Sequence, residues 1–379
     1  MQNIFFSCGL AFLITFFSIP AIIEVAESKN LYDEPEGRKV HKTVIPTLGG
    51  LGIFAGFIIA TLMGVNPSMS GILQYILAAG MILFFIGIKD DILVISASKK
   101  FIGQLLAAII IIKFADINIT NMYGFLGVYE LSPTVSVLLS VFTIVVIINS
   151  FNLIDGVDGL AGSLSLLTSL IFGFYFWKTG QDLYAVMAFS LTGSLIAFLI
   201  FNFNPARIFM GDTGSLLIGL LNSIFVIKFI SLASDPQSAM PLQSAPAIGF
   251  AILIVPLFDT LRVFTMRILK RRSPFSPDKN HIHHFLLDLG FGHRAIVFLC
   301  VAANIFFIAI AYFLRSYGTT IAVSCLTLIS ISIVTLIYYS RPKKRVISLG
   351  QKSKKSNISV TSSKVLSFNG EPVKESTSL

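Results

Sequence analysis

The sequence predicts an all-α membrane protein, a polytopic bundle of about eleven transmembrane helices. Of its 379 residues, 55% are hydrophobic and only 12% are charged, which lies outside the range of soluble domains. The mean hydropathy is +0.84. Apolar runs of about 20 residues recur along the chain, and each is long enough to cross a bilayer as a helix. A membrane protein with many spans is therefore expected.

The expected spans follow one another from the N-terminus. In chain order they are residues 3–24, 47–65, 71–88, 102–114, 133–149, 160–177, 183–202, 214–234, 247–266, 295–314 and 318–338. The first is expected to be a true span rather than a cleaved signal peptide, because no basic residue precedes its long apolar run. All three cysteines lie inside spans, so buried thiols are expected and a disulfide framework is not.

The basic residues set the expected orientation. An N-terminus on the outside places 23 of the 28 lysine and arginine residues in six cytoplasmic segments, as the positive-inside rule requires. The C-terminus is then cytoplasmic too. We expect one transmembrane unit with cytoplasmic loops, residues 1–340, and a basic Ser/Lys-rich tail, residues 341–379, that is disordered. The net charge of +9 follows from this distribution, and no nucleic-acid partner is expected.

An acidic pair, Asp90 and Asp91, ends the third expected span. Neighbouring carboxylates repel each other, so they need a cation, a shared proton or full solvation. A solvated loop is the simpler interpretation. The sharper one is that the pair supplies oxygen ligands for Mg²⁺ or places a general base beside it. Lys99 and Lys100 follow closely and are both suited to holding anionic groups of a substrate.

The stretch "NSFNLIDGVDGLAG" (149–162) lies at the end of the fifth expected span and places Asn149, Asn152, Asp155 and Asp158 at steps of three. Over nine residues an ideal helix turns such a stripe about half way round its axis, so one flat polar face is excluded. Gly156 predicts that the helix ends near Asp155 and leaves the carboxylates open to a ligand. A glycine cap with solvated aspartates is the alternative.

The segment "NFNPARIFMGDTGS" (202–215) reads as the end of one span, a loop and the start of the next. Asp212 stands between two glycines, so its carboxylate has little steric cover. An N-cap of the following helix explains it equally well. Arg207 is suited to pairing with phosphate, and Phe209 to stacking on a nucleobase.

Three of the five histidines, His281, His283 and His284, cluster in "NHIHH". No cysteine is near and the carboxylates favour hard cations, so a zinc site is disfavoured. Phosphate binding or proton transfer is the preferred role of the histidines. A solvated loop without a functional role is the alternative. All these polar segments map to the expected cytoplasmic side. That one-sidedness favours an active site at one membrane face over a transporter, whose polar positions more often lie at the bilayer midplane.

Together, "KDD", "NSFNLIDGVDGLAG", "FNFNPARIFMGDTGS" and "SPFSPDKNHIHHFLLDLG" resemble the motifs of the polyprenyl-phosphate N-acetylhexosamine-1-phosphate transferases. The resemblance runs in matching order from about residue 36 to 292. The form "SPDKNHIHH" looks more like the branch using UDP-N-acetylglucosamine than the peptidoglycan branch, whose loop typically has three consecutive histidines. A CDP-alcohol phosphotransferase is disfavoured because no arginine follows the Asp-Gly dipeptide in "DGLAG".

The resemblance implies a role for each matching residue. Asp90 and Asp91 match an acidic pair of which one member is proposed to deprotonate the lipid phosphate, and Asp212 matches a Mg²⁺ ligand. The expected catalytic residues are Asp90, Asp91, His283 and His284, and the expected metal ligands are Asp212 and Asp91. The expected substrate-binding residues are His41, Lys99, Lys100, Asn152, Asp155, Asp158, Arg207, Phe209 and His281.

The expected reaction transfers N-acetylhexosamine-1-phosphate, with N-acetylglucosamine favoured, from a UDP-sugar to undecaprenyl phosphate. It gives undecaprenyl-diphospho-sugar and UMP and needs Mg²⁺, for which Mn²⁺ is a substitute. The expected location is the inner (plasma) membrane, with many spans and the active site facing the cytoplasm. The sequence leaves a homodimer open. The alternatives are the phospho-N-acetylmuramoyl-pentapeptide transferase of peptidoglycan synthesis and a transporter of anionic sugars.

Overall fold

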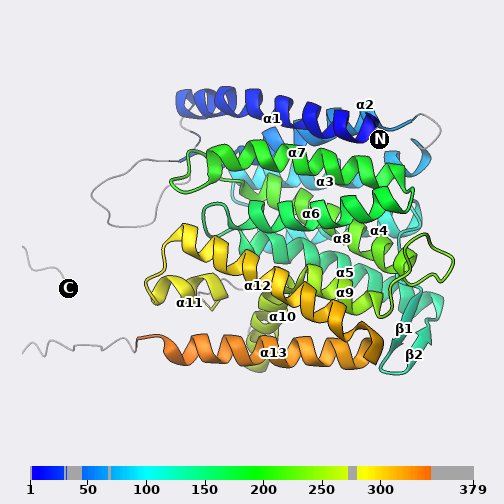
Figure 1. Ribbon diagram of the computed structural model, residues 1–379. Helices are drawn as coiled ribbons and strands as arrows, with labels where there is room; N and C mark the ends of the chain where they lie inside the picture. The colour runs from blue at the N-terminus through cyan, green and yellow to red at the C-terminus, as the bar shows by residue number, and fades with distance from the viewer. Residues whose placement is uncertain (1, 30, 32–44, 67–69, 272–279, 343–379) are drawn as a thin grey trace, which may run out of the picture. The chain divides into compact units, whose positions relative to one another are not determined.

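The computed structural model describes residues 2–29, 31, 45–66, 70–271 and 280–342. His41 and the expected disordered tail beyond residue 342 lie outside these ranges. Almost all of the described chain is helical (Figure 1). The helices are α1 (Gln2–Ser28), α2 (Gly49–Gly64), α3 (Ser70–Ile92), α4 (Ala97–Lys113), α5 (Pro133–Ile154), α6 (Leu160–Lys178), α7 (Asp182–Asn202), α8 (Gly211–Ala233), α9 (Ala245–Ile252), α10 (Ile254–Leu269), α11 (Ile282–Asp288), α12 (His293–Leu314) and α13 (Thr319–Ser340).

The protein is a polytopic membrane protein, as expected, but the count of eleven spans is not confirmed. Eight described helices are long and apolar enough to cross a membrane: α1, α3, α5, α6, α7, α8, α12 and α13. The pair α9 and α10 adds a ninth if the two together form one broken span. With 16 and 17 residues, α2 and α4 rise only about 25 Å, short of a hydrocarbon core of about 30 Å.

The expected straight span 247–266 is broken instead. The chain bends by 84° at Leu253, between α9 and α10. Pro256 explains the break, because it has no N–H and its ring would clash with the carbonyl of Ile252 in a continuous helix. Asn304 of α12 satisfies the freed groups: its Nδ2 donates to the carbonyl of Ile252 at 2.9 Å, and its Oδ1 accepts from Val255 N at 3.4 Å.

A short β-hairpin is the one departure of the described chain from an all-α fold. Strands β1 (Asn121–Phe125) and β2 (Val128–Glu130) pair antiparallel, with Phe125 opposite Val128. The two residues between them, Leu126 and Gly127, have φ values of 52° and 75°, and a two-residue turn of this kind needs both positive. Strands of five and three residues leave too short an alternating pattern to be recognised in the sequence.

The helices alternate in direction, which gathers particular helix ends at one end of the bundle (Figure 1). The last turns of α3 and α5 lie there with the first turns of α4 and α8 and with α11, while the hairpin lies at the opposite end. Helix α8 is apolar on all sides because it is buried over most of its length among α2, α3, α5, α6 and α9. It therefore serves as the rigid centre against which the polar end is built.

Candidate active site

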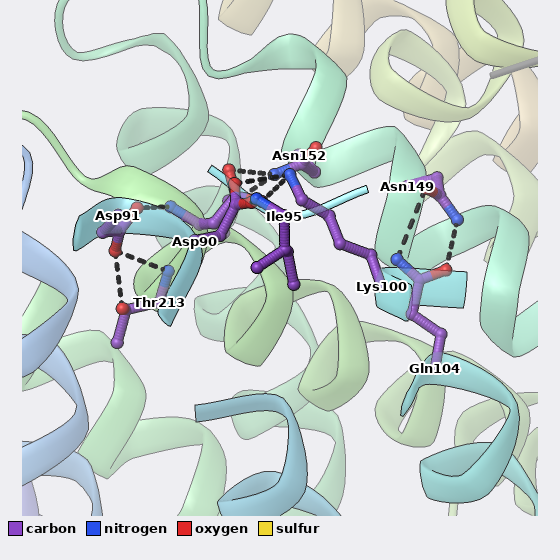
Figure 2. Close-up of polar contacts among 10 residues, drawn as sticks. Asp90, Asp91, Ile95, Lys100, Gln104, Asn149, Asn152 and Thr213 are labelled. Carbon is purple, nitrogen blue, oxygen red and sulfur yellow. Dashed lines mark hydrogen bonds and ion pairs between the residues drawn. The ribbon is translucent and has the colours of Figure 1, made fainter. Parts of the chain in front are cut away.

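The acidic pair lies in the last turn of α3, and Asp91 reaches across to the start of α8. Its Oδ1 accepts the Asp212 N–H at 2.7 Å, and its Oδ2 accepts the Thr213 N–H at 3.0 Å and the Thr213 hydroxyl at 2.6 Å (Figure 2). The first N–H groups of a helix have no partner within it, and its N-terminus favours negative charge. Asp91 thus caps α8 from a different helix.

A glycine makes this approach feasible. Gly211 begins α8 with a φ of 71°, in the left-handed region that side chains disfavour. A Cβ there would stand 2.7 Å from both carboxylate oxygens of Asp91 and would clash with the carbonyl of Thr47. Gly211 therefore lets the first residues of α8 approach Asp91 closely, and this contact positions Asp212.

Lys100, in the first turns of α4, joins the other two carboxylates (Figure 2). Its Nζ lies 2.6 Å from Oδ2 of Asp90 and 2.6 Å from Oδ2 of Asp212. Asn152 of α5 donates from Nδ2 to Oδ1 of Asp212 at 3.0 Å and to Ser215 Oγ at 2.9 Å. One ammonium group between two partly buried carboxylates is weakly screened, so this bridge holds α3, α4 and α8 together. Asp212 has both oxygens occupied in this arrangement.

Asp155 ends α5, as the sequence predicts, and its carboxylate stands apart from this network. Among the described residues it has no hydrogen-bond or ion-pair partner. Burial raises the pKa of Asp155 well above its usual value, and the negative charges of Asp212, Asp91 and Asp158 raise it further. Lys100 pairs with Asp90 and Asp212 alone, and a further cation beside Asp155 would favour its charged form.

A cavity of about 610 Å³ opens beside this cluster. We call Lys100, Asn152 and Asp155, with the carboxylates bonded to them, the carboxylate wall of its lining, and the histidines of "HIHH" with Arg267 the histidine wall. Gln104 and Asn149 close its wall with a reciprocal amide pair, in which Asn149 Nδ2 donates to Gln104 Oε1 at 2.8 Å (Figure 2). The volume lies within the usual range for small-molecule sites. Cationic, anionic and amide groups thus converge on one space.

The histidine side of the cavity is built on α11 and on α10 beneath it. His281 is the N-cap of α11, and its Nδ1 lies 2.8 Å from Oδ2 of Asp259 in α10. The His281 and His283 rings stack at a centroid distance of 5.7 Å, and His283 lies 4.3 Å from the ring of His284. The three imidazoles line the same cavity as Asp155 and Lys100, and the site that the sequence assigns to them stays a prediction.

His283 is 2% exposed, and its Nδ1 has no partner within the described part of the chain. Burial lowers the pKa of His283 to about 4; the positive charges of His284 and His281 act in the same direction, while the charge of Asp259 opposes them. His283 is therefore neutral near pH 7. A buried ring nitrogen without a partner, at the edge of a cavity, is suited to a hydrogen bond with a bound ligand.

The donor set fits a hard divalent cation. The described residues contain no group of three or more His, Cys, Asp or Glu side chains already arranged around one point. Mg²⁺ does not require one, because it is usually held by one or two carboxylates together with substrate phosphates. Asp155 supplies an unpartnered carboxylate, and Lys100 shows that the oxygens of Asp212 favour a cation.

Asp90, Asp91 and Asp212 stand beside the cavity without lining it, and four other expected site residues also lie outside the lining. Lys99 is exposed, so of the two candidate lysines the structure brings only Lys100 into the cluster. Asp158 instead accepts from Asn204 Nδ2 at 2.8 Å and lies 3.1 Å from His293 Nδ1. Arg207 is exposed, with its guanidinium 5.7 Å from the Phe201 ring centroid, and Phe209 is tied by its backbone to Pro46 and Gly49. Their expected roles stay predictions.

Three polar residues of the site region were missed by sequence reasoning: Gln104, Asp259 and Arg267. All lie in or beside apolar runs that read as ordinary spans. Asp259 and Arg267 are 1% and 4% exposed. A signal was available, because ionisable residues within a span are rare and mark functional positions more often than not.

Comparisons with known proteins find a matching family and similar chains. A family model described as glycosyl transferase family 4 matches residues 73–230, which include the acidic pair and Asp212. The chain is 34% identical over 311 residues to a decaprenyl-phosphate N-acetylglucosaminephosphotransferase of Mycobacterium leprae (strain TN), covering 76% of this chain and 78% of that protein. It is 32% identical over 287 residues to an undecaprenyl-phosphate alpha-N-acetylglucosaminyl 1-phosphate transferase of Escherichia coli O157:H7, covering 74% and 76%.

Proposed function

Because this chain belongs to glycosyl transferase family 4, we propose that it transfers N-acetylglucosamine-1-phosphate from UDP-N-acetylglucosamine to undecaprenyl phosphate. The products are undecaprenyl-diphospho-N-acetylglucosamine and UMP. The names of the relatives support a polyprenyl-phosphate acceptor and this sugar. The observation that carries the proposal is the convergence of Lys100, Asp155 and three histidines on a single cavity, with Asp90 and Asp212 paired to Lys100 beside it.

The reaction joins two anions. A phosphate oxygen of the lipid attacks the β-phosphorus of the UDP-sugar, a new P–O bond forms, and the bond to the UMP oxygen breaks. UMP leaves with the electron pair of that bond. Because both reactants are negatively charged, catalysis depends on holding the phosphates in line and on neutralising their charge.

Lys100, at the centre of the carboxylate cluster, is placed to meet the incoming phosphates. A phosphate oxygen that displaces one of its two carboxylate partners would keep the ammonium group paired throughout. The released carboxylate would then be free to hold a cation or a proton. Of the acidic pair, Asp90 is our choice as the base toward the lipid phosphate, since Asp91 already accepts three hydrogen bonds from α8. His283 and His284, which line the same cavity as Lys100, would also contact the diphosphate.

We assign Asp212 as the first ligand of Mg²⁺ or Mn²⁺, with Asp155 beside it and Asp91 holding Asp212 in place. Direct ligation by Asp91 stays a prediction. The ion, when bound, would withdraw negative charge from the diphosphate oxygens. The remaining substrate contacts proposed from the sequence are Asn152 and His281, which line the cavity, and His41, Asp158, Arg207 and Phe209, which rest on the sequence alone.

The bilayer orientation follows from the charge distribution. With the positive-inside rule, the end of the bundle that contains the cavity faces the cytoplasm, where a soluble UDP-sugar is available, and the protein resides in the inner membrane. The lipid acceptor reaches the site from the bilayer. A peptidoglycan-type sugar donor and a role in transport remain the competing functions, and a homodimer is compatible with each.

The test uses membranes that contain the protein, a long-chain polyprenyl phosphate, Mg²⁺ and a panel of UDP-sugars. We expect UMP release and a new lipid product with UDP-N-acetylglucosamine, and little with UDP-N-acetylmuramoyl-pentapeptide. UMP from the pentapeptide donor alone would reassign the substrate. Sugar uptake into vesicles without UMP would support the transporter, and no UMP from any sugar would refute the transferase.

A further inference from the structure

We propose that Asp259 is a positioning residue for the histidine motif: its carboxylate fixes the proton of His281 on Nδ1 and thereby presents Nε2 to the cavity. The inference rests on the proposed function for its catalytic consequence, but its structural part stands on the geometry alone. Asp259 is 1% exposed and is not among the cavity-lining residues, so it acts on a substrate only through His281.

The two carboxylate oxygens of Asp259 have different partners. Oδ2 faces His281 Nδ1 at 2.8 Å. Oδ1 accepts from Arg262 Nη2 at 2.7 Å and from the backbone N–H of Ile282 at 3.1 Å. The second bond satisfies an orphan N–H in the first turn of α11, and Arg262 balances the buried charge. One side chain therefore both caps α11 and contacts its first histidine.

This arrangement determines the tautomer of His281. A carboxylate can only accept hydrogen bonds, so the ring nitrogen that faces it must bear a proton. With Nδ1 protonated, Nε2 is the nitrogen left for a ligand, and it has no hydrogen-bond partner within the described ranges. The ring itself lines the cavity. A carboxylate that orients an imidazole in this way is a recurrent device in metal and catalytic sites.

Helix α11 has further contacts that hold it in place besides the bond between Asp259 and His281. Its Phe285 is 1% exposed and lies between two guanidinium groups, with Arg341 at 3.9 Å and Arg262 at 5.2 Å from the ring centroid. Arg262 also donates to the carbonyl of Asn280, immediately before His281. The helix is thus anchored independently of the His281 bond, so loss of that bond alone should leave α11 in place.

The variant Asp259→Asn separates the two roles of the carboxylate. Two donors, Arg262 and the Ile282 N–H, converge on the Oδ1 position, so the amide oxygen is expected to turn toward them. The amide NH₂ then faces His281 Nδ1, which must become an acceptor. The helix cap is retained while the proton moves to Nε2.

The direct readout is ¹⁵N NMR of the full-length protein labelled at histidine and held in lipid nanodiscs. The chain has only five histidines, and His281→Gln identifies the signal of interest. At about pH 8.5, two units above the ordinary histidine pKa, the wild-type spectrum should show a protonated Nδ1 for His281, and Asp259→Asn should show a protonated Nε2 instead. An unchanged His281 signal in Asp259→Asn would overturn the proposal.

Activity supplies the second readout. Loss of an orienting partner typically costs about 10- to 100-fold, and we expect kcat/KM of Asp259→Asn to fall by this factor. In a His281→Gln background the same substitution should cost less than about twofold, because the oriented group is already gone. An equal loss in both backgrounds would mean that Asp259 acts only on folding and would refute the positioning role.

Asp288→Asn is the matched control. It removes a carboxylate from the same helix, on the side that faces Arg341 rather than His281, and should keep the wild-type tautomer and kcat/KM within about twofold. If the wild-type protein releases no UMP, the proposed function is wrong, but the NMR result for His281 still stands. The two failures are therefore distinguishable.

Discussion

The two walls of the cavity are built on different principles. The carboxylate wall joins the ends of α3, α4 and α8 through charged groups, with Lys100 bridging Asp90 and Asp212. The histidine wall stands on α11, a helix of seven residues, and His283 at its centre is neutral and buried. The structure of the carboxylate wall thus depends on charge pairs, while that of the histidine wall depends on hydrogen bonding and on the packing of a short helix.

This difference predicts how each wall responds to change. Removing a charge from the first leaves its partners uncompensated in a weakly screened space, which is costly for chemistry on anionic substrates. Removing a group from the second disturbs orientation or packing, and the loss is smaller. Substitutions on the carboxylate wall should therefore cost more turnover than substitutions on the histidine wall, some of which act mainly on stability.

The largest effect is expected from Asp212→Ala. It deletes the acceptor of Lys100 and Asn152 and the proposed metal ligand, so kcat should fall by about 10³-fold or more while the protein still inserts and folds. UMP release from UDP-N-acetylglucosamine measures it. Asp182→Asn, an exposed carboxylate at the start of α7, is the control and should retain full turnover. Turnover retained in Asp212→Ala would exclude it as the metal ligand.

A somewhat smaller loss is expected from Lys100→Met. Removal of the bridging ammonium leaves two carboxylates facing each other and deprives the phosphates of a cation, so we expect kcat/KM to fall by about 10²- to 10³-fold. Lys99→Met is a close match, since it removes an adjacent, exposed lysine, and should change kcat/KM by less than about twofold. The reverse ranking of the two variants would move the phosphate contact to Lys99.

Much of the carboxylate wall was predictable from sequence because its information is local. The end of α5 near Asp155 followed from the glycines that come after it, and the opening of the loop before Asp212 followed from its flanking glycines. The apolar runs located the helices, since hydrophobic length is a strong signal in a membrane protein. The sequence does not show which lysine pairs with Asp212, because Lys100 and Asp212 are 112 residues apart in sequence.

The histidine wall was predicted only in part. The motif itself stood out, but its support did not, because Asp259 lies in an apolar run that reads as one span; Pro256 in that run was a local sign of the bend. The break at Leu253 depends on Asn304 of α12, which compensates the lost backbone bonds from about 50 residues away. Such long-range compensation leaves no local pattern, whereas the Asp259 and Arg262 pair in one span was a readable signal of function.

His283→Gln tests the claim that the histidine wall is neutral. The pKa of His283 is lowered to about 4, so between about pH 6.5 and 4 the unfolded chain binds a proton that the folded chain does not. This residue therefore makes the free energy of unfolding fall as pH falls through that window, by on the order of 3 kcal/mol at its lower end. His283→Gln should remove this part of the pH dependence.

The measurement is the thermal unfolding midpoint of the detergent-purified protein at several pH values, compared between wild type and variant. The difference isolates His283, because other titrating groups are common to both proteins. Parallel curves for wild type and His283→Gln would mean that the buried imidazole is charged.

The smallest effect is expected from Arg341, which follows α13 and contacts Phe285 of α11. Arg341 lies 3.9 Å from the Phe285 ring centroid and 4.4 Å from that of Tyr338, and its ion pair with Asp288 is 3.4 Å long and partly exposed. Cation–π contacts and exposed ion pairs each contribute about 0.5 to 1 kcal/mol, so Arg341→Ala should lower the unfolding midpoint by a few degrees at most. Arg341→Lys keeps the charge but loses the planar stacking. Its unfolding midpoint should lie between those of the wild type and Arg341→Ala. If Arg341→Ala instead abolished turnover, α11 would depend on the end of α13 for its place in the site, and the two walls would differ less than their contacts indicate.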